Sequence, residues 1–355
     1  MLHITEGNLL ESSAEAIVNT VNTVGVMGKG IALQFKRAYP DNFKEYEAAC
    51  RRGEVVIGRV LIHQTNTFDN PRFVINFPTK RHWRSRSKIE DIEAGLDDLK
   101  RVILEKELRS ISVPPLGCGN GGLPWSKVQP LIELKLGDIP NVDVYVYAPT
   151  GTPDASSMPV RTKRPKLTRF GAAVLLAFKK YMALSIEAGL SVEPKLSMLE
   201  AHKVAYFLQV SGWPLRLNFD QGHYGPYAKD LDLFISSVEG HFIRGFGDGT
   251  GGAKATLTLD PSVLNEAAEM LGTDKGYQEA LDRLESVVGG FEFPYGVELL
   301  STVHYAASVE HPSDHKLQMI IDRIAAWSPR KRKLFRPEQA MVAYEHLERC
   351  DLIPR

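Results

Sequence analysis

Three segments of the sequence carry residue types that bind anions. The first begins with the apolar run 16–18, continues through a loop containing Gly25, Gly28 and Gly30, and ends in a helical pattern from Ile31. Glycines let backbone N–H groups turn inward, and the N-terminus of a helix attracts a diphosphate. The glycine spacing matches neither the dinucleotide fingerprint nor a Walker A loop. A glycine turn that opens a helix is also common as plain structure, so the other segments must decide.

The two other segments follow strand-like runs further along the chain. The run 73–77 leads into Pro78, Thr79 and Lys80, and the run 111–113 leads into a second glycine-rich loop at 117–121. In an α/β sheet the ends of neighbouring strands meet at one edge and form a crevice. We therefore expect the three segments to line one site, with Lys80 facing the two glycine loops. A lysine in such a loop is also consistent with simple phosphate binding.

A basic stretch at 81–88 follows Lys80 directly and contains one indole. Cations interleaved with an aromatic ring suit phosphate contacts and stacking on an unpaired base. A basic loop is more often only a solvated surface. Because this one adjoins Lys80, we expect Arg81, His82, Trp83 and Arg84 to contact single-stranded DNA.

The elements that must position these segments alternate in type over residues 1–150. Strand-like runs occupy 2–6, 16–20, 55–63, 73–77, 110–113 and 142–148. Helical runs occupy 31–37, 42–51, 89–106 and 127–136. This alternation predicts an α/β fold with a mixed or parallel sheet that is covered by helices on both faces.

The totals indicate a globular protein with two domains. The chain has 355 residues, 43% of them apolar, and a formal net charge of zero. It shows no signal-peptide pattern and no apolar run of about 18 residues, so we expect a cytoplasmic protein without a membrane segment. Its three cysteines predict no disulfide framework, and His3, His63 and His82 lack the spacing of metal ligands, so no metal is expected.

The second half of the chain differs in composition from the first. We expect a domain at 1–150, a linker rich in Pro, Ser and Thr with a basic run at 151–169, and a mainly helical domain at 170–355. A short strand at 253–259 beside the helices resembles a winged-helix arrangement. Residues 187–322 include 20 Asp and Glu but 9 Lys and Arg, a net charge of −11. This charge is either a solubilising surface or a mimic of nucleic acid that occupies a basic groove on a partner.

The three segments together resemble the macrodomain family. Asn19 and Asn22 match its Val-Asn-x-x-Asn segment, 117–119 match its second phosphate loop, and Asn8 stands where an acidic residue usually contacts adenine. The resemblance implies an ADP-ribose site, with ADP-ribose as ligand and product and no cofactor. The residues it implies in binding are Asn8, Leu9, Thr20, Val21, Asn22, Gly28, Lys29, Gly30, Ile31, Thr79, Gly117, Cys118, Gly119, Asn120 and Gly121.

Each part of this set has an implied role. Asn8 and the Leu9 amide would meet the adenine, and Thr20 to Asn22 would border the terminal ribose, where Asn22 offers both a donor and an acceptor. The glycine loops would enclose the diphosphate with their backbone N–H groups.

A narrower resemblance is to the DarG family, the macrodomain antitoxins of DarT/DarG toxin–antitoxin pairs. The motifs that carry it are 27–32, Thr79 with Lys80, and 117–119 followed by Leu123 and Trp125. It implies an ADP-ribosyl glycohydrolase that repairs single-stranded DNA modified on thymidine, with Lys80 as the catalytic nucleophile. It also implies that the C-terminal domain binds and inhibits a DarT-like ADP-ribosyltransferase toxin.

The lysine chemistry requires a neutral amine. Lowering the pKa of a lysine from about 10.4 to about 8 takes on the order of 3 kcal/mol. We expect desolvation and the nearby cations Arg81, Arg84, Arg86 and Lys88 to supply it. Protein-directed relatives have an acidic residue in the second loop, but here the loop continues with Asn120 and two glycines. A water, the substrate base or His82 must then handle the proton.

Two functions of other classes remain open from the sequence. One is a non-catalytic ADP-ribose reader in which Lys80 only binds the ligand. The other is a DNA-binding regulator that acts through the C-terminal half.

Overall fold

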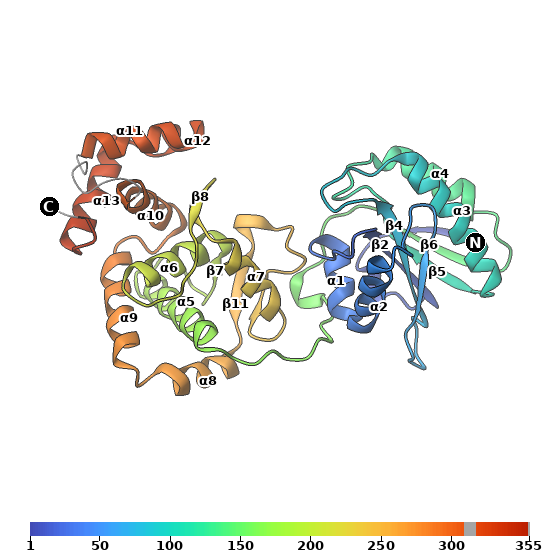
Figure 1. Cartoon of the computed structure of the whole chain (residues 1–355), viewed down its shortest axis with the longest axis horizontal. Helices are drawn as coiled ribbons and strands as arrows, with labels where there is room; N and C mark the ends of the chain where they lie inside the picture. The colour runs from blue at the N-terminus through green and yellow to red at the C-terminus, as the bar shows by residue number, and fades with distance from the viewer. Residues whose placement is uncertain (309–316, 354–355) are drawn as a thin grey trace. The chain divides into compact units, whose positions relative to one another are not determined.

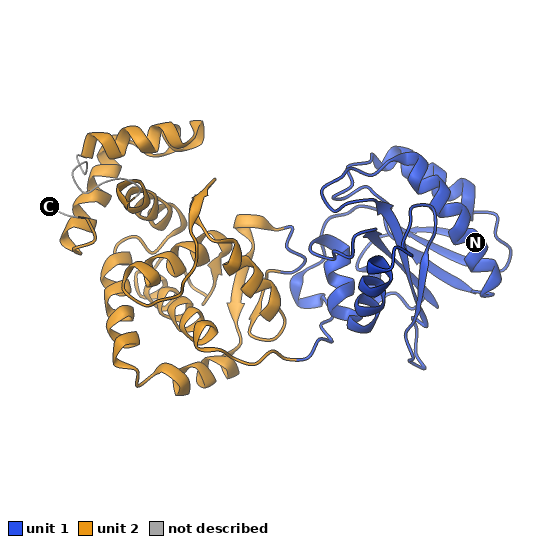
Figure 2. Ribbon diagram, viewed as in Figure 1, with its two compact units in different colours: residues 1–163, 247–250 blue, residues 164–246, 251–355 orange. Residues whose placement is uncertain are grey.

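The structure, a computed structural model, describes residues 1–308 and 317–353. It divides into two compact units, one of residues 1–163 with 247–250 and one of residues 164–246 with 251–355 (Figure 2). The short segment 247–250 thus belongs to the first unit although it lies in the second half of the sequence. In the described part of the chain, every helix is too short or too polar to span a membrane.

The first unit contains a six-stranded sheet (Figure 1). Its strands are β1 (Leu2–Thr5), β2 (Ala16–Asn22), β3 (Leu61–Gln64), β4 (Phe73–Lys80), β5 (Ser110–Val113) and β6 (Asp143–Tyr147), in the order β1-β6-β5-β2-β4-β3. All neighbours are parallel except β3 and β4. The central strands β2 and β4 are buried almost throughout because both faces of such a sheet are covered.

Four helices cover the two faces of this sheet: α1 (Gly30–Ala38), α2 (Pro40–Arg51), α3 (Ile89–Glu105) and α4 (Trp125–Leu136). Successive side chains of a strand point to opposite faces. Accordingly, Ala16 and Val18 of β2 pack in a cluster with α3 and α4, whereas Ile17 and Val21 pack with α1 and α2. The mixed sheet covered on both faces confirms the fold class expected for this half.

The strand expected at 55–63 is shorter than its apolar residues indicate. Strand β3 begins only at Leu61, and Gly58 has a φ of +81° in the turn that precedes it. Val55 is buried, but it packs in the apolar cluster beside α2 and not in the sheet. An apolar pattern reports burial, and here the burial comes from a packed loop.

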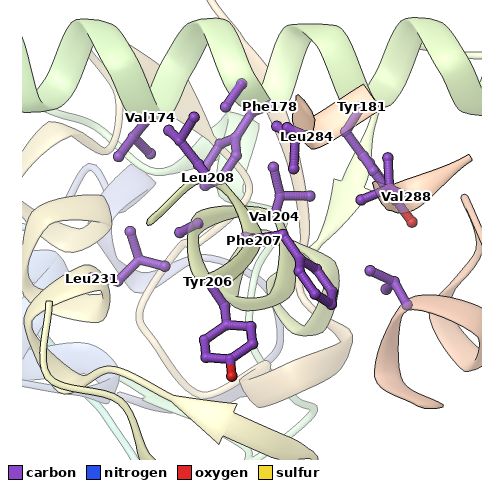
Figure 3. Close-up of a cluster of buried hydrophobic side chains, with 14 of the residues drawn as sticks. Val174, Phe178, Tyr181, Val204, Tyr206, Phe207, Leu208, Leu231, Leu284 and Val288 are labelled. Carbon is purple, nitrogen blue, oxygen red and sulfur yellow. The ribbon is translucent and has the colours of Figure 1, made fainter. Parts of the chain in front are cut away.

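The second unit is mainly helical, as expected. Its helices are α5 (Arg169–Glu187), α6 (Met198–Val210), α7 (Lys229–Val238), α8 (Pro261–Leu271), α9 (Lys275–Val288), α10 (Pro294–Ser308), α11 (Leu317–Trp327), α12 (Pro329–Leu334) and α13 (Pro337–Arg349). Figure 3 shows side chains of α5, α6 and α9 meeting in the core, among them Phe178, Phe207 and Leu284.

Two small sheets complete this unit. The strand expected at 253–259 is β11 (Thr256–Leu259), which pairs with β10 (Ile243–Arg244) and with β7 (Leu196–Ser197). A hairpin of β8 (Asp220–Gly222) and β9 (Gly225–Tyr227) had no counterpart among the predicted elements. Its strands are three residues each, too short for an alternating pattern to appear.

Candidate active site

Lys80 is the last residue of β4 and is paired in register with Asn22 of β2. Its half-buried amine lies 3.0 Å from the backbone carbonyl of Asn120 and 3.4 Å from that of Trp83. Among the residues that the structure describes, Lys80 forms no ion pair with a carboxylate. Burial lowers its pKa, which favours the neutral amine that a nucleophile requires.

The arginines that follow Lys80 are not the cause of this shift. Desolvation by burial is the cause of the lowered pKa of Lys80. The guanidinium of Arg81 lies 2.9 Å from a carboxylate oxygen of Asp91, which balances its charge. The expectation that nearby cations lower the pKa is therefore wrong, because it assumed that Arg81 faces the amine with its charge unpaired.

Asn22 organises the loop that follows β2. The side chain is only 4% exposed, and its Oδ1 accepts hydrogen bonds from the N–H groups of Val24 (3.0 Å) and Val26 (3.3 Å). Its Nδ2 donates to the carbonyl of Val26 at 2.6 Å. The expected donor and acceptor are present, but both are engaged by the protein's own backbone. Asn22 therefore acts in this structure by shaping the site.

A buried tyrosine that the sequence reasoning missed supports Asn22. Tyr46 of α2 is fully buried, and its hydroxyl donates to the backbone carbonyl of Asn22 at 2.7 Å. Nothing in the sequence marks Tyr46, since an aromatic residue on an amphipathic helix is expected in the core. Its role in supporting Asn22 is visible only in the tertiary structure, where α2 brings the tyrosine hydroxyl to the Asn22 carbonyl.

The two glycine loops meet at Gly30 and Asn120. Gly30 begins α1 with a φ of +63°, and a Cβ placed on it would lie 3.1 Å from the side-chain nitrogen of Asn120. Gly28, Lys29, Gly119 and Asn120 are exposed, so the loops present their backbone to solvent. The sequence-based expectation that these loops lie together agrees with this contact.

The N–H of Gly30 already has a partner. It donates to the backbone carbonyl of Asp248 at 2.9 Å, within the segment 247–250 of the same unit. This group was expected to face a diphosphate together with those of Gly28, Lys29 and Ile31. In this structure it does not, because a segment far away in the sequence supplies a competing acceptor.

The second glycine loop is held against Ser87. The N–H of Ser87 donates to the carbonyl of Gly121 at 3.0 Å, and a Cβ on Gly121 would lie 2.3 Å from the Ser87 hydroxyl oxygen. Gly117 has a φ of +71°, which also favours glycine. Burial raises the pKa of Cys118 to about 11, so its thiol is protonated at neutral pH and is no nucleophile.

The remaining predicted ligand residues lie around the ends of β1, β2 and β4. Asn8 caps a short 3-10 helix: its Oδ1 accepts from the Leu10 N–H, and its Nδ2 lies 3.2 Å from the carbonyl of Ser157. Leu9 is buried, and Thr20 is half-buried. The hydroxyl of Thr79 donates to the carbonyl of Val21, whose side chain is in the core.

Comparison with known proteins decides the family. A model of the Macro domain matches residues 18–132. The chain is 48% identical to the DNA ADP-ribosyl glycohydrolase of Thermus aquaticus, over 93% of this chain and 89% of that one. It is 39% identical to the protein of the same name from Mycobacterium tuberculosis, over 98% and 99% of the two chains. The chain belongs to the DNA ADP-ribosyl glycohydrolase, or DarG, family.

Membership of the DarG family confirms the macrodomain resemblance and the glycohydrolase class. Among solved structures, the macrodomain of M. tuberculosis DarG is 53% identical and covers 42% of this chain and 99% of its own, with a TM-score of 0.42. A fusion of DNA ADP-ribosyl transferase and DNA ADP-ribosyl glycohydrolase from Thermosipho africanus is 33% identical over 42% of each chain.

In this DarG family member the segment 81–84 after Lys80 is joined through its backbone to the loop that follows β2. The Thr23 hydroxyl donates to the Arg81 carbonyl at 2.8 Å. The guanidinium of Arg84 lies 4.4 Å from the centre of the Trp83 ring, and the His82 ring lies 5.4 Å from it. His82, Trp83 and Arg84 thus form an exposed cluster, whereas Arg81 is engaged with Asp91. Within the described residues, no group of His, Cys, Asp and Glu could hold a metal ion.

Proposed function

We propose that the chain removes ADP-ribose from thymidine in single-stranded DNA, with Lys80 as the nucleophile. The observation that carries this proposal is a half-buried amine with a lowered pKa that donates to two backbone carbonyls. A lysine that only binds phosphate would instead be expected to be fully exposed and to keep its positive charge. The curated relatives are named DNA ADP-ribosyl glycohydrolases, which supports DNA as the substrate.

The reaction proceeds through a Schiff base. The neutral amine of Lys80 forms a bond to the anomeric carbon of the terminal ribose, and the bond from that carbon to the base breaks. The two protons of the amine pass to the ring oxygen of the opened sugar and to the departing base. Water then hydrolyses the Schiff base, which returns the amine and releases ADP-ribose. Because Asn120 replaces a carboxylate in the second loop, water or the base carries these protons.

Trapping tests this mechanism on the full chain. With ADP-ribosylated single-stranded DNA, borohydride reduction is expected to fix ADP-ribose on the peptide that contains Lys80. Lys80→Ala is expected to abolish both trapping and release, whereas Lys106→Ala, at an exposed lysine directly after α3, retains trapping. Full release by Lys80→Ala would exclude the nucleophile, and tight ADP-ribose binding without turnover in the unmutated chain would favour a reader.

We propose further that the C-terminal unit binds and inhibits a DarT-like ADP-ribosyltransferase. The fusion protein from Thermosipho africanus, which combines a transferase and a glycohydrolase, supports a functional pairing of the two activities. Co-purification of the full chain with its DarT-like toxin and inhibition of the toxin's DNA modification test this role. Lys80→Ala should bind and inhibit as well as the unmutated chain, since the proposed binding unit lies elsewhere.

A further inference from the structure

Three large apolar residues in the segments that adjoin Lys80 are exposed to solvent. Val24 is 46% exposed, Val26 is 39% exposed and Trp83 is 46% exposed. Single exposed apolar residues are ordinary, but a group that borders a reactive amine indicates a surface for a ligand. Neither the diphosphate loops nor the Lys80 chemistry uses Val24 or Val26.

Backbone hydrogen bonds connect the segments that carry these side chains to Lys80. Val24 and Val26 are fixed through the side chain of Asn22, which is the register partner of Lys80 across the sheet. The backbone carbonyl of Trp83 lies 3.4 Å from the Lys80 amine. The Thr23 hydroxyl joins the two segments at the carbonyl of Arg81. The loop 23–26 and the segment 81–84 are therefore connected to each other, and both adjoin Lys80.

The reaction places a nucleobase in the same region. Lys80 attacks the carbon to which the base is attached, so the base lies within about two bonds of the forming bond. Arg84 and His82 lie against the Trp83 indole, but the residue remains 46% exposed and can still meet a flat group. The base is flat, and thymine differs from other pyrimidines by an apolar methyl group, which proteins read through apolar contacts.

We propose that Val24, Val26 and Trp83 form a nucleobase subsite in which the two valines contact the 5-methyl group of thymine. The indole stacks on the ring and accepts any pyrimidine, because stacking is tolerant of the base. The valines then supply the discrimination. This inference rests on the proposed function and adds the origin of its base specificity.

The test compares two oligonucleotides that carry ADP-ribose on thymine or on uracil at the same position. The unmutated chain should release ADP-ribose from thymine with a kcat/KM about fourfold higher, the factor expected for burial of one methyl-sized group. The double variant Val24→Thr, Val26→Thr keeps the side-chain shape and should bring this ratio close to 1. Trp83→Ala should lower kcat/KM for both substrates by the same factor.

The control is Phe68→Ser, which changes a fully exposed residue in the turn at the opposite end of β4 from Lys80. It should leave the ratio unchanged. A ratio of 1 in the unmutated chain, or a ratio that persists in the double valine variant, would overturn the subsite. Absence of release from both oligonucleotides in the unmutated chain would instead overturn the proposed function on which the subsite rests.

Discussion

At the scale of single residues, burial lowers the pKa of Lys80 and so favours its neutral form. Its amine is removed from water by the ends of two strands and by the loop at Asn120, and no carboxylate is paired with it among the described residues. Burial disfavours the ammonium form, and backbone carbonyls are weaker partners for it than a carboxylate. Both features suit the nucleophilic role proposed for Lys80.

The lowered pKa of Lys80 predicts the pH dependence of the reaction. In the proposed mechanism the neutral amine attacks, so kcat/KM should rise with pH and level off once the pH exceeds the lowered pKa, below the ordinary value of 10.5. A single-turnover pH profile with ADP-ribosylated single-stranded DNA measures this. A rate that falls with rising pH over the same range would show that the ammonium form is the active one.

At the scale of elements, helix α2 controls the loop that follows β2. The hydroxyl of Tyr46 reaches the backbone of Asn22 from inside the core, and the Asn22 side chain then sets the positions of Val24 and Val26. A buried carbonyl that loses its donor destabilises the fold by about 1–3 kcal/mol. The geometry of the site is therefore coupled to the packing of a helix that contributes no ligand.

Tyr46→Phe tests this coupling. The variant should fold, lose about 1–2 kcal/mol of unfolding free energy, and lose roughly tenfold in kcat/KM, because a loosened loop positions the substrate poorly. Hydrogen exchange at the amides of Val24 and Val26 should accelerate. Tyr145→Phe in β6 is the matched control and should change neither rate nor exchange. An unchanged exchange rate in Tyr46→Phe would show that α2 does not control the conformation of the loop.

Two buried lysines connect secondary-structure elements in the core of the second unit. Lys203 of α6 is buried, and its amine donates to the carbonyl of Pro226 in the β8–β9 hairpin at 2.6 Å. Lys331 of α12 lies 2.7 Å from a carboxylate oxygen of Glu298 in α10. Burial lowers the pKa of Lys203 to about 7 and that of Lys331 to about 8. Lys203 thus links α6 to the β8–β9 hairpin, and Lys331 links α12 to α10.

These lysines predict that the second unit becomes more stable as the pH rises. Above pH 7 the folded chain holds Lys203 neutral, while the unfolded chain keeps that lysine protonated up to its ordinary pKa of 10.5. The unfolded state then binds more protons, so the unfolding free energy should rise by about 2 kcal/mol between pH 7 and pH 9. Urea unfolding at both values measures this, and Lys331 contributes with the same sign.

The matched variants are Lys203→Met in the core and Lys229→Met at an exposed position of α7. Lys203→Met should flatten the rise in stability with pH, whereas Lys229→Met should retain it. An equal pH dependence in both variants would mean that Lys203 is protonated in the folded chain.

At the scale of the whole molecule, the net charge of −11 over 187–322 overstates the charge of the surface. Glu200, Asp260 and Asp274 cap helices, and Glu298 is buried between Arg330 and Lys331. Such carboxylates stabilise the unit's own fold. Those available to a partner are exposed ones, which include Glu269 of α8 and Glu279 of α9.

Charge reversal tests whether this surface holds the toxin. Glu269→Lys with Glu279→Lys should weaken binding of a DarT-like toxin by about tenfold at low salt and by less at high salt. Asp69→Lys with Glu133→Lys, two exposed residues of the macrodomain unit, changes the net charge equally and should leave binding intact. Titration calorimetry at two salt concentrations measures both. Equal weakening by the two pairs would indicate a general effect of net charge.

Local sequence patterns were sufficient for the succession of strands and helices, the α/β fold of residues 1–150 and the position of Lys80 after a strand beside two glycine loops, and the resemblance in motifs added the macrodomain family. Apolar periodicity and glycine placement report the conformation of neighbouring residues, and parallel strand ends must share an edge. The hairpin β8–β9 was not predicted, because strands of three residues show no alternating period. The turn before β3 was not predicted either, because buried residues in a loop give the same apolar pattern as a buried strand.

Only the tertiary structure decided what each polar group of the site does. It turned Asn22 toward its own loop, gave that residue Tyr46 as a partner 24 positions away, and paired Arg81 with Asp91. It also brought the carbonyl of Asp248 to the N–H of Gly30. A polar side chain is satisfied by whichever donor or acceptor the packing brings near it, and residue type and spacing do not determine that neighbour.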